Sequence, residues 1–305
     1  MLGHFRELTP DSAAEFEAYA GRRPIYTCEG QFLTQYIWAE LNELRYTTDD
    51  KAMYFVFRNE KRAAALMPFC AREDIPESLQ RLEEYFRNEF GEPLTVLVAD
   101  EVFAQTVAAD PELSAQYEIT EARNSFDYIY EAEKLRTLSG KKLHKKKNNL
   151  NYFMREYEGR YVYRTLDCSL GPEIEAYQLR WEADRDADDP DGNLTVEERG
   201  IFKIFENCSR LDCEMGGIYI DGQLEAYSIG SYNEALSMAD IQIEKANPEI
   251  RGLYTMINQQ FLVHAFPQAE LVNREDDMGE EGLRQAKESY YPLRLEKKYT
   301  IRQRG

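Results

Sequence analysis

Residues 217–229, GIYIDGQLEAYSI, contain two apolar runs separated by Asp221-Gly222. An Asp-Gly pair between such runs is typical of a two-residue β-hairpin turn, because the twist of the turn matches that of the strands. Residues 235–243, ALSMADIQI, follow with the composition of a third strand. This part of the chain is therefore predicted to form an antiparallel sheet.

Helical and extended segments alternate on both sides of this hairpin. In the C-terminal half the pattern predicts helices at residues 141–157, 172–184, 196–208, 253–265 and 280–288, with further strands at 160–166, from 271, and at 293–301. In the N-terminal half it predicts helices at 13–20, 32–44, 78–90 and 102–108, strands at 53–57, 63–67 and 94–98, and an extended segment at 117–131. That order predicts the α/β (α+β) fold class.

The two halves repeat one order of elements, which predicts two tandem domains related by duplication. A chain of 305 residues has room for two domains of medium size. We place the boundary in the segment Thr137-Leu138-Ser139-Gly140. The expected domains are residues 1–137 and residues 138–305, and the second is expected to carry the chemistry.

The composition limits the partners of the chain. It has 56 Asp and Glu against 37 Lys and Arg, a net charge of −19, which repels nucleic acid and anionic membranes at long range. A polyanionic ligand would therefore need a local basic patch. No run approaches the ~20 apolar residues of a membrane-spanning helix, and residues 1–10 lack the apolar run of a signal peptide. We therefore expect a soluble, cytoplasmic protein without a transmembrane segment.

The cysteines point to the same compartment. They number five, at positions 28, 70, 168, 208 and 213, and an odd count with irregular gaps is typical of free thiols in a reducing environment. Cys208 and Cys213 are the only close pair, and no second pair follows them. With only three histidines in the chain, no metal site is expected.

One segment, residues 135–155, is basic although the chain as a whole is acidic; we call it the basic segment, and the helix predicted within it the basic helix. Residues 135–155 contain no Asp or Glu but include His144 and the basic residues Arg136, Lys141, Lys142, Lys145, Lys146, Lys147 and Arg155. An exposed lysine in the first turns of a helix lies near the positive end of the helix dipole and destabilises the helix by ~0.3–1 kcal/mol. The stability of the helix therefore does not explain why lysines stand there. Two interpretations remain open. The segment is either a phosphate-binding helix, with Lys141, Lys142, Lys145 and Lys146 as ligands, or a solvated basic face that keeps an acidic protein folded or pairs with nearby acids.

The order of elements around the hairpin resembles the GNAT fold of N-acetyltransferases. In that fold a loop between the third strand and the next helix binds a pyrophosphate through its backbone amides. The corresponding segment here is Asn247-Pro248-Glu249-Ile250-Arg251-Gly252, and Arg251 and Gly252 match the motif, whereas its later glycine is missing. This resemblance covers the C-terminal half, and the whole-chain resemblance described next implies two GNAT-like domains, each a mixed, mostly antiparallel sheet flanked by helices. The resemblance of the C-terminal half implies that Arg251 and Gly252 bind the donor.

A second resemblance extends over the whole chain. Residues 138–151, 243–246, 257–258, 273–283, 287 and 290–292 are similar to the soluble members of the phosphatidylglycerol lysyltransferase C-terminal-domain family. This implies kinship with enzymes that move an amino acid from aminoacyl-tRNA onto a lipid headgroup or a peptide amine. The implied partners are a tRNA acceptor stem or coenzyme A, and a small-molecule or peptide amine acceptor. No tightly bound cofactor is expected.

Acyl transfer to an amine requires a base, donors for the developing oxyanion and an acid for the leaving group. Glu244, at the end of the third strand, is the first choice for a base or a ligand of the acceptor amine. Asp276 and Asp277 follow the next strand and are candidates for holding a cationic group. Lys287 is placed near the site by the resemblance, and Tyr290 or Tyr291 is a candidate proton donor. Each also has a structural interpretation, as a strand-end carboxylate, an acidic turn, a surface lysine or a core aromatic.

Three functions remain open from the sequence. The first is an aminoacyl- or acyltransferase that uses aminoacyl-tRNA to modify an amine or hydroxyl group. The second is an N-acetyltransferase that uses acetyl-CoA, and the third is a non-catalytic binding protein on the same scaffold. The first requires the Lys145 region of the basic helix to face Glu244.

Overall fold

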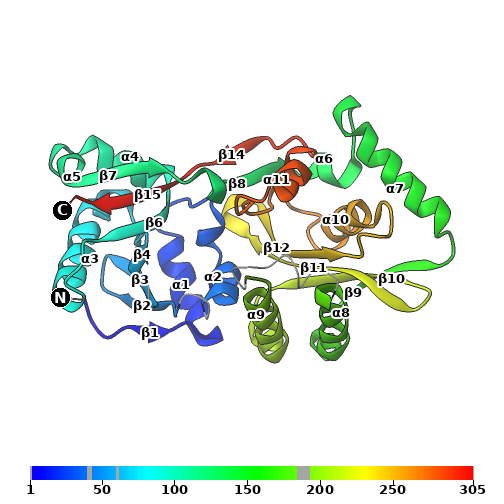
Figure 1. Cartoon of the computed structure of the whole chain (residues 1–305), viewed down its shortest axis with the longest axis horizontal. Coiled ribbons are helices and arrows are strands. Elements are labelled where there is room, and N and C mark those ends of the chain that lie inside the picture. The colour runs from blue at the N-terminus through cyan, green and yellow to red at the C-terminus, as the bar shows by residue number, and fades with distance from the viewer. Residues whose placement is uncertain (1, 40–42, 60–61, 184–192, 305) are drawn as a thin grey trace. The chain divides into compact units, whose positions relative to one another are not determined.

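The computed structural model describes residues 2–39, 43–59, 62–183 and 193–304 (Figure 1). The chain divides into two compact units. The first comprises Met1–Asp127, Asp276–Gly279 and Glu296–Gly305, and the second comprises Tyr128–Glu275 and Glu280–Leu295. The first division therefore falls earlier in the chain than the boundary at 137/138 that element order suggests, and two short C-terminal segments return to the first unit.

A mixed sheet forms the centre of the first unit. Its strand order is β1-β2-β3-β4-β6-β15-β7, with β5 paired to β3; among the described strands the β4–β6 pair is parallel and the other pairs are antiparallel. The strands are β1 (Arg6–Glu7), β2 (Arg45–Thr48), β3 (Ala52–Asn59), β4 (Arg62–Leu66), β5 (Phe69–Cys70), β6 (Thr95–Asp100), β7 (Tyr117–Glu121) and β15 (Lys298–Gln303).

The helices of the first unit pack aromatic side chains against this sheet. They are α1 (Ala13–Ala20), α2 (Phe32–Trp38), α3 (Ile75–Glu89), α4 (Glu101–Ala109) and α5 (Pro111–Gln116). Phe16 of α1 makes an edge-on contact with Phe69, at 5.3 Å between ring centroids, and both side chains are fully buried. The Asp100 carboxylate accepts the Phe103 N–H, which fixes the start of α4 directly after β6.

The second unit contains a seven-stranded sheet in the order β14-β8-β13-β12-β11-β10-β9. Its strands are β8 (Asp127–Glu131), β9 (Tyr161–Thr165), β10 (Glu214–Ile220), β11 (Gln223–Asn233), β12 (Met238–Ala246), β13 (Leu271–Asn273) and β14 (Arg294–Glu296). The predicted hairpin is confirmed as β10 and β11. Its turn residues Asp221 and Gly222 have φ of 52° and 86°, as a turn of this kind requires.

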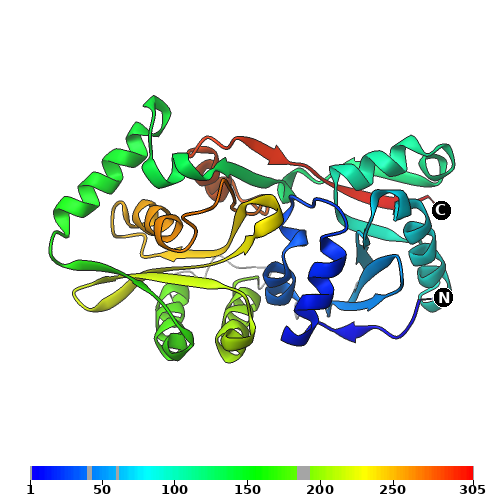
Figure 2. The same cartoon turned by 180° about the vertical axis from the view of Figure 1, so that it is seen from behind.

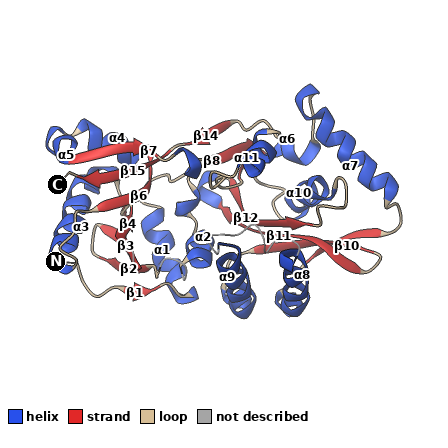
Figure 3. Cartoon of the chain, in the orientation of Figure 1, coloured by secondary structure: helices blue, strands red, loops and turns tan. Residues whose placement is uncertain are grey.

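Helices lie on both faces of this sheet. They are α6 (Ala132–Thr137), α7 (His144–Glu156), α8 (Gly171–Ala183), α9 (Asn193–Asn207), α10 (Leu253–His264) and α11 (Glu281–Glu288). Figures 2 and 3 show α10 on one face and α8 and α9 on the other. Phe261 of α10 is buried against the first face, and the Tyr227 hydroxyl donates to Gln178 of α8 on the second. The predicted fold class, two mixed sheets with flanking helices, is confirmed in each unit.

Two predicted extended segments each contribute to both sheets. Residues 117–131 form β7 in the first sheet and β8 in the second, and the predicted last strand is two strands, β14 and β15. β15 pairs with β6 and β7, so the sheet of the N-terminal half is completed by the C-terminal residues of the chain. Local periodicity identifies strands but does not reveal which sheet they join, because pairing depends on partners distant in sequence.

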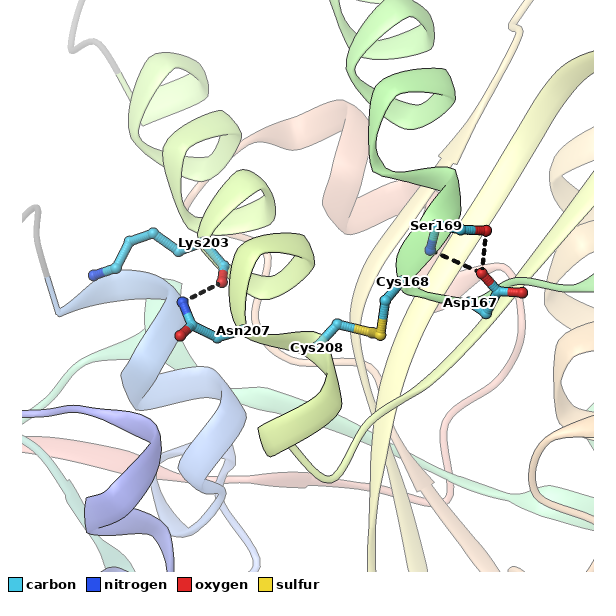
Figure 4. Close-up of a disulfide and its surroundings, with 6 residues drawn as sticks. All are labelled: Asp167, Cys168, Ser169, Lys203, Asn207 and Cys208. Carbon is cyan, nitrogen blue, oxygen red and sulfur yellow. Dashed lines mark hydrogen bonds between the residues drawn. A yellow bond between two sulfur atoms is a disulfide. The ribbon is translucent and has the colours of Figure 1, made fainter.

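The expectation that all cysteines are free thiols is wrong. Cys168, before α8, and Cys208, after α9, form a disulfide, and the other three cysteines are free (Figure 4). The bond joins two segments separated by 40 residues in sequence. Spacing could not reveal this pair, because the two helices bring together cysteines that lie far apart in the chain.

We expect three titratable thiols per chain in protein that is unfolded without reductant, and five after reduction. Because the bond closes a loop of 40 residues, the Cys168→Ser and Cys208→Ser double variant should lose about 2–4 kcal/mol of unfolding free energy. Urea titrations of the oxidised wild type and the variant measure this difference. Five titratable thiols before reduction would contradict the disulfide. A Cys213→Ser variant serves as the control and should retain the Cys168–Cys208 disulfide.

Among the described helices, none is both long enough and apolar enough to cross a membrane.

Candidate functional site

A β-bulge in β12 decides where Glu244 points. Ile229 pairs with Ile243, whereas the next residue of β11, Gly230, pairs with Ile241, so Gln242 is an extra residue on β12. Because side chains alternate along a strand, one extra residue reverses the faces of all residues after it. Glu244 therefore lies on the same face as Ile241, the face covered by α10.

The carboxylate of Glu244 is held there by two donors. Asn258 of α10 donates its Nδ2–H to Oε2 at 2.8 Å, and Arg274 donates from Nη2 to Oε1 at 2.8 Å. The side chains of Arg274 and Glu244 are 12% and 11% exposed. A charge pair with this degree of burial keeps most of its attraction, because little water remains to screen it.

Arg274 reaches Glu244 because β12 and β13 separate. Their parallel pairing runs from Met238 with Leu271 to Asp240 with Asn273 and then ends. β12 continues to Ala246, while β13 is followed directly by Arg274. The ion pair therefore links the two strands beyond the end of their ladder, at the carboxyl ends of adjacent parallel strands, where α/β folds often place ligands.

Tyr290 and Lys146 complete this group of polar residues. The Tyr290 hydroxyl lies 3.4 Å from Thr255 Oγ1 of α10, and the guanidinium carbon of Arg274 lies 4.9 Å from the centre of the Tyr290 ring. Lys146 of α7 places its Nζ 3.8 Å from the same ring centre. We call Glu244, Arg274, Asn258, Thr255, Tyr290 and Lys146 the polar cluster.

Burial changes the titration of two members of the polar cluster. It raises the pKa of Tyr290, so the phenol stays protonated at neutral pH. It lowers the pKa of Lys146 to about 8, with a further contribution from the positive charge of Arg274, while Glu244 acts in the opposite direction. Lys146 is thus neutral in a sizeable fraction of molecules near pH 8, unlike an ordinary lysine.

The polar cluster also contains two unsatisfied atoms. Arg274 Nη1 and Asn258 Oδ1 are buried and have no hydrogen-bond partner among the residues that the structure describes. The first is a donor and the second an acceptor. Buried polar atoms without partners are uncommon in folded proteins and call for an explanation, of which a ligand is one.

The basic helix faces the polar cluster at one position and solvent at others. Lys146 is half-buried, whereas Lys141, Lys142, Lys145 and Lys147 are exposed. Within the described residues, none of these four exposed lysines has an ion-pair partner. Among the described residues these lysines thus form a solvated basic face without acidic partners, an arrangement that fits both a phosphate-binding helix and a face that only keeps the protein folded. Because Lys146 interacts with the charge of Glu244, the predicted proximity of this helix region to Glu244 is present.

Arg251 and Gly252 lie where α7 packs on the start of α10. Gly252 has φ of 89°, and a Cβ on it would come within 2.4 Å of the Asn149 carbonyl oxygen. The Arg251 guanidinium is exposed, lies over the Tyr152 ring at 4.5 Å and reaches Asn149 Oδ1 at 3.3 Å. Gly252 is therefore required for packing between backbones, whether or not the loop also binds a donor.

Three other predicted site residues, Asp276, Asp277 and Lys287, are not members of the polar cluster. Asp276 and Asp277 belong to the first unit, where Asp277 is fully buried and pairs with Arg123 at 3.1 Å. Asp276 accepts the Met278 N–H at 3.1 Å and so shapes the turn. Lys287 is close to the polar cluster but supports its backbone, because its Nζ donates to the Arg274 carbonyl at 2.5 Å. Of the predicted site residues, the structure thus brings Glu244, Lys146 and Tyr290 together, and Lys287 contacts the backbone of Arg274 next to them.

Arg274 and Asn258 are functional candidates to which the sequence alone assigned no role. A usable signal exists for each. Arg274 is the first residue after a strand whose parallel neighbour, β12, carries Glu244 near its end. Asn258 lies three residues after Thr255, on the same face of α10.

A second group of charged residues lies in the first unit. Cys28, Glu29 and Asp127 are buried, and their ligand-type atoms lie within 4.8 Å of one another. The ammonium of Lys298 lies among them, 2.8 Å from Glu29 and 2.8 Å from Asp127. A lysine thus supplies the positive charge that a metal ion would otherwise provide, so the residues present favour a structural ion cluster.

Comparisons with known proteins agree with this architecture. The chain is 28% identical over 184 residues to an uncharacterized protein of Mycoplasmoides gallisepticum, a match that covers 59% of this chain and 56% of that relative. The chain thus matches only about half the length of that relative. It also resembles a conserved protein of unknown function from Bacteroides thetaiotaomicron, with 25% identity, a TM-score of 0.88 and full coverage of both chains.

More distant structures show the fold. The C-terminal domain of a proposed lysylphosphatidylglycerol synthetase from Agrobacterium fabrum has a TM-score of 0.68 at 14% identity, covering 97% of this chain and 93% of that one. A tandem GNAT protein from the clavulanic acid biosynthesis pathway has a TM-score of 0.51 at 11% identity, covering 98% and 97%. The predicted GNAT-like tandem fold, an acyltransferase fold, is therefore confirmed.

The predicted family is confirmed as well. The family model described as phosphatidylglycerol lysyltransferase, C-terminal, matches residues 22–302, which include both sheets except β1 and the last residue of β15. The chain therefore belongs to the phosphatidylglycerol lysyltransferase C-terminal family.

Proposed function

We propose that this protein transfers an aminoacyl group from aminoacyl-tRNA to the amine or hydroxyl group of a small molecule or peptide, and that the polar cluster is its active site. The observation that carries the proposal is the pair of unsatisfied buried atoms, Arg274 Nη1 and Asn258 Oδ1. The two atoms belong to residues that both bind Glu244. A donor N–H and an acceptor oxygen held in this way complement an acyl carbonyl oxygen and the N–H of an attacking amine.

The other members of the polar cluster supply proton transfer. The acceptor nitrogen attacks the carbonyl carbon, and the bond from that carbon to the ribose oxygen breaks. Lys146 in its neutral form takes the proton of the amine, and the protonated Tyr290 hydroxyl gives one to the departing oxygen. Glu244 has both oxygens engaged and keeps Arg274 in place, so we assign it a positioning role.

The donor would be held by residues next to the polar cluster. Lys141, Lys142 and Lys145 are exposed cations without ion-pair partners in the described part of the chain, and Arg251 and Gly252 lie at the start of α10. An otherwise acidic protein with such a patch can bind a polyanion through it while the remaining surface repels one. An aminoacyl-tRNA donor also places the reaction in the cytoplasm.

The test measures binding and transfer with two donors at low salt. Purified protein is titrated with aminoacyl-tRNA, with uncharged tRNA and with acetyl-CoA, and each donor is then incubated with an amine mixture. We expect binding of aminoacyl-tRNA and release of its amino acid to an acceptor. Transfer from acetyl-CoA alone would identify an N-acetyltransferase instead. Binding without transfer would favour a non-catalytic protein, and no binding of any donor would refute the proposal.

Transfer should depend on pH through Lys146. Because the neutral amine is the active form and the pKa is about 8, we expect the rate to rise with pH up to that region and then level off. Lys146→Met should remove this rise and lower the plateau. Lys147→Met, which changes an exposed neighbour, serves as the control. An unchanged pH profile in the Lys146 variant would show that another group accepts the proton.

A further inference from the structure

Tyr291 is held in an uncommon conformation that exposes its side chain. Its φ of 55° lies in the left-handed region, which costs a non-glycine residue about 1–2 kcal/mol. The turn is fixed by N–H bonds from Tyr290 to the Lys287 carbonyl at 3.1 Å and from Tyr291 to the Glu288 carbonyl at 2.9 Å. As a result Tyr290 is buried in the polar cluster, whereas Tyr291 is 50% exposed.

The exposed ring lies beside the basic segment. Lys142 Nζ is 5.3 Å from the centre of the Tyr291 ring, and Lys146, four residues later, lies over Tyr290. Lys141 and Lys145 are exposed nearby in sequence and have no ion-pair partner among the described residues. Each of the two adjacent tyrosines thus lies beside one of two lysines that are four residues apart. Lys146 and Tyr290 belong to the polar cluster, whereas Lys142 and Tyr291 lie outside it.

We propose that Tyr291 and Lys142 form a binding subsite for the terminal nucleotide of the donor, with the base stacked on Tyr291 and the phosphates near Lys142. This inference rests on the proposed function and deepens it. An aromatic face accepts any base, and stacking contributes about 1–3 kcal/mol per base. A lysine ammonium is a point charge on a flexible side chain and can bind a phosphate. An aromatic ring beside a lysine therefore suits a nucleotide better than a purely apolar partner.

Two sources can supply this nucleotide, namely the single-stranded 3′ end of an RNA and the nucleotide part of coenzyme A. The structure favours the RNA. Lys141 and Lys145 are exposed in the same segment as Lys142, and none of the three has an ion-pair partner among the described residues. This is more positive charge than one nucleotide requires, and a strand with several phosphates would contact more of it.

The experiment compares Tyr291→Ala, Tyr291→Phe and a control, Leu179→Ala. Leu179 is 57% exposed on α8, on the other face of the second sheet from α10. The probes are an RNA hairpin with a single-stranded 3′ ACCA end, the same hairpin with a blunt end, and coenzyme A. Affinities are measured by fluorescence anisotropy or calorimetry, and melting temperatures verify that every variant is folded.

We expect Tyr291→Ala to bind the ACCA hairpin about tenfold more weakly than the wild type. Tyr291→Phe and Leu179→Ala should bind it normally, and the blunt hairpin should bind all variants alike. A tenfold loss with coenzyme A but not with RNA would support the subsite with coenzyme A as the source. If Tyr291→Ala binds every probe as the wild type does, the subsite is refuted while the proposed function stands. If the wild type binds no probe, the proposed function itself fails.

Discussion

Replacing Lys298 by methionine is expected to lower the free energy of unfolding by about 3–5 kcal/mol. Lys298 is fully buried on β15, and its Nζ lies 2.8 Å from Glu29, 2.8 Å from Asp127 and 3.2 Å from Cys28 Sγ. The nearby carboxylates outweigh burial and raise the pKa of Lys298 well above its usual value, so the group is charged. Removing the ammonium takes away the cation that lies between two buried carboxyl groups.

The neighbouring Lys297 provides a matched control for this prediction. Its Nζ lies 2.7 Å from Glu121, but the two side chains are 44% and 51% exposed. Surface pairs of this kind contribute about 0–1 kcal/mol, so Lys297→Met should leave unfolding nearly unchanged. Urea denaturation of both variants gives the comparison. A loss below 1 kcal/mol for Lys298→Met would contradict the structural role that we assign to the cluster.

Replacing Arg274 by glutamine is expected to reduce the rate of aminoacyl transfer by about 10²–10³-fold, the effect of removing one preorganised oxyanion donor. Donor affinity should change little, because the donor is held by the exposed lysines of the basic segment. Arg274→Lys keeps the positive charge but has one terminal nitrogen in place of two, so it cannot bind Glu244 and the acyl oxygen from separate nitrogens, and we expect an intermediate rate. The measurement is a single-turnover rate together with a separate dissociation constant for aminoacyl-tRNA.

The control for Arg274 is Arg160→Gln. Arg160 also belongs to the second unit and pairs with Asp221, but the two side chains are 52% and 54% exposed and lie at the β10–β11 turn. Its rate should equal that of the wild type. If Arg274→Gln retains at least a third of the rate, or if it loses affinity and rate in equal proportion, Arg274 does not act on the transition state.

The local elements of this fold could be predicted because short-range physics determines them. The Asp221-Gly222 turn, the α3 and α4 helices and the basic helix all depend on neighbours within a few residues. The exchange of strands between the sheets could not be predicted this way. β15 joins β6 and β7, which lie far from it in sequence, and no local pattern records that partner.

The candidate site was predictable only in part. Glu244 follows from its position at the end of the third strand, Tyr290 from the resemblance to the GNAT fold, and Lys146 from the acid-free segment. The bulge at Gln242, which turns Glu244 toward α10, left no signal in the composition of β12. The placement of Asp276 in the first unit likewise depends on the chain crossing between sheets, which local periodicity does not encode.

The central claim is that the polar cluster and the basic segment act on one donor. A crystal structure of the protein with a non-hydrolysable aminoacyl amide of 3′-amino-3′-deoxyadenosine tests it most directly. We predict that the acyl carbonyl oxygen lies within hydrogen-bonding distance of Arg274 Nη1, with the nucleotide toward Tyr291 and Lys142. An analogue bound away from Arg274, with the basic segment uncontacted, would contradict the account.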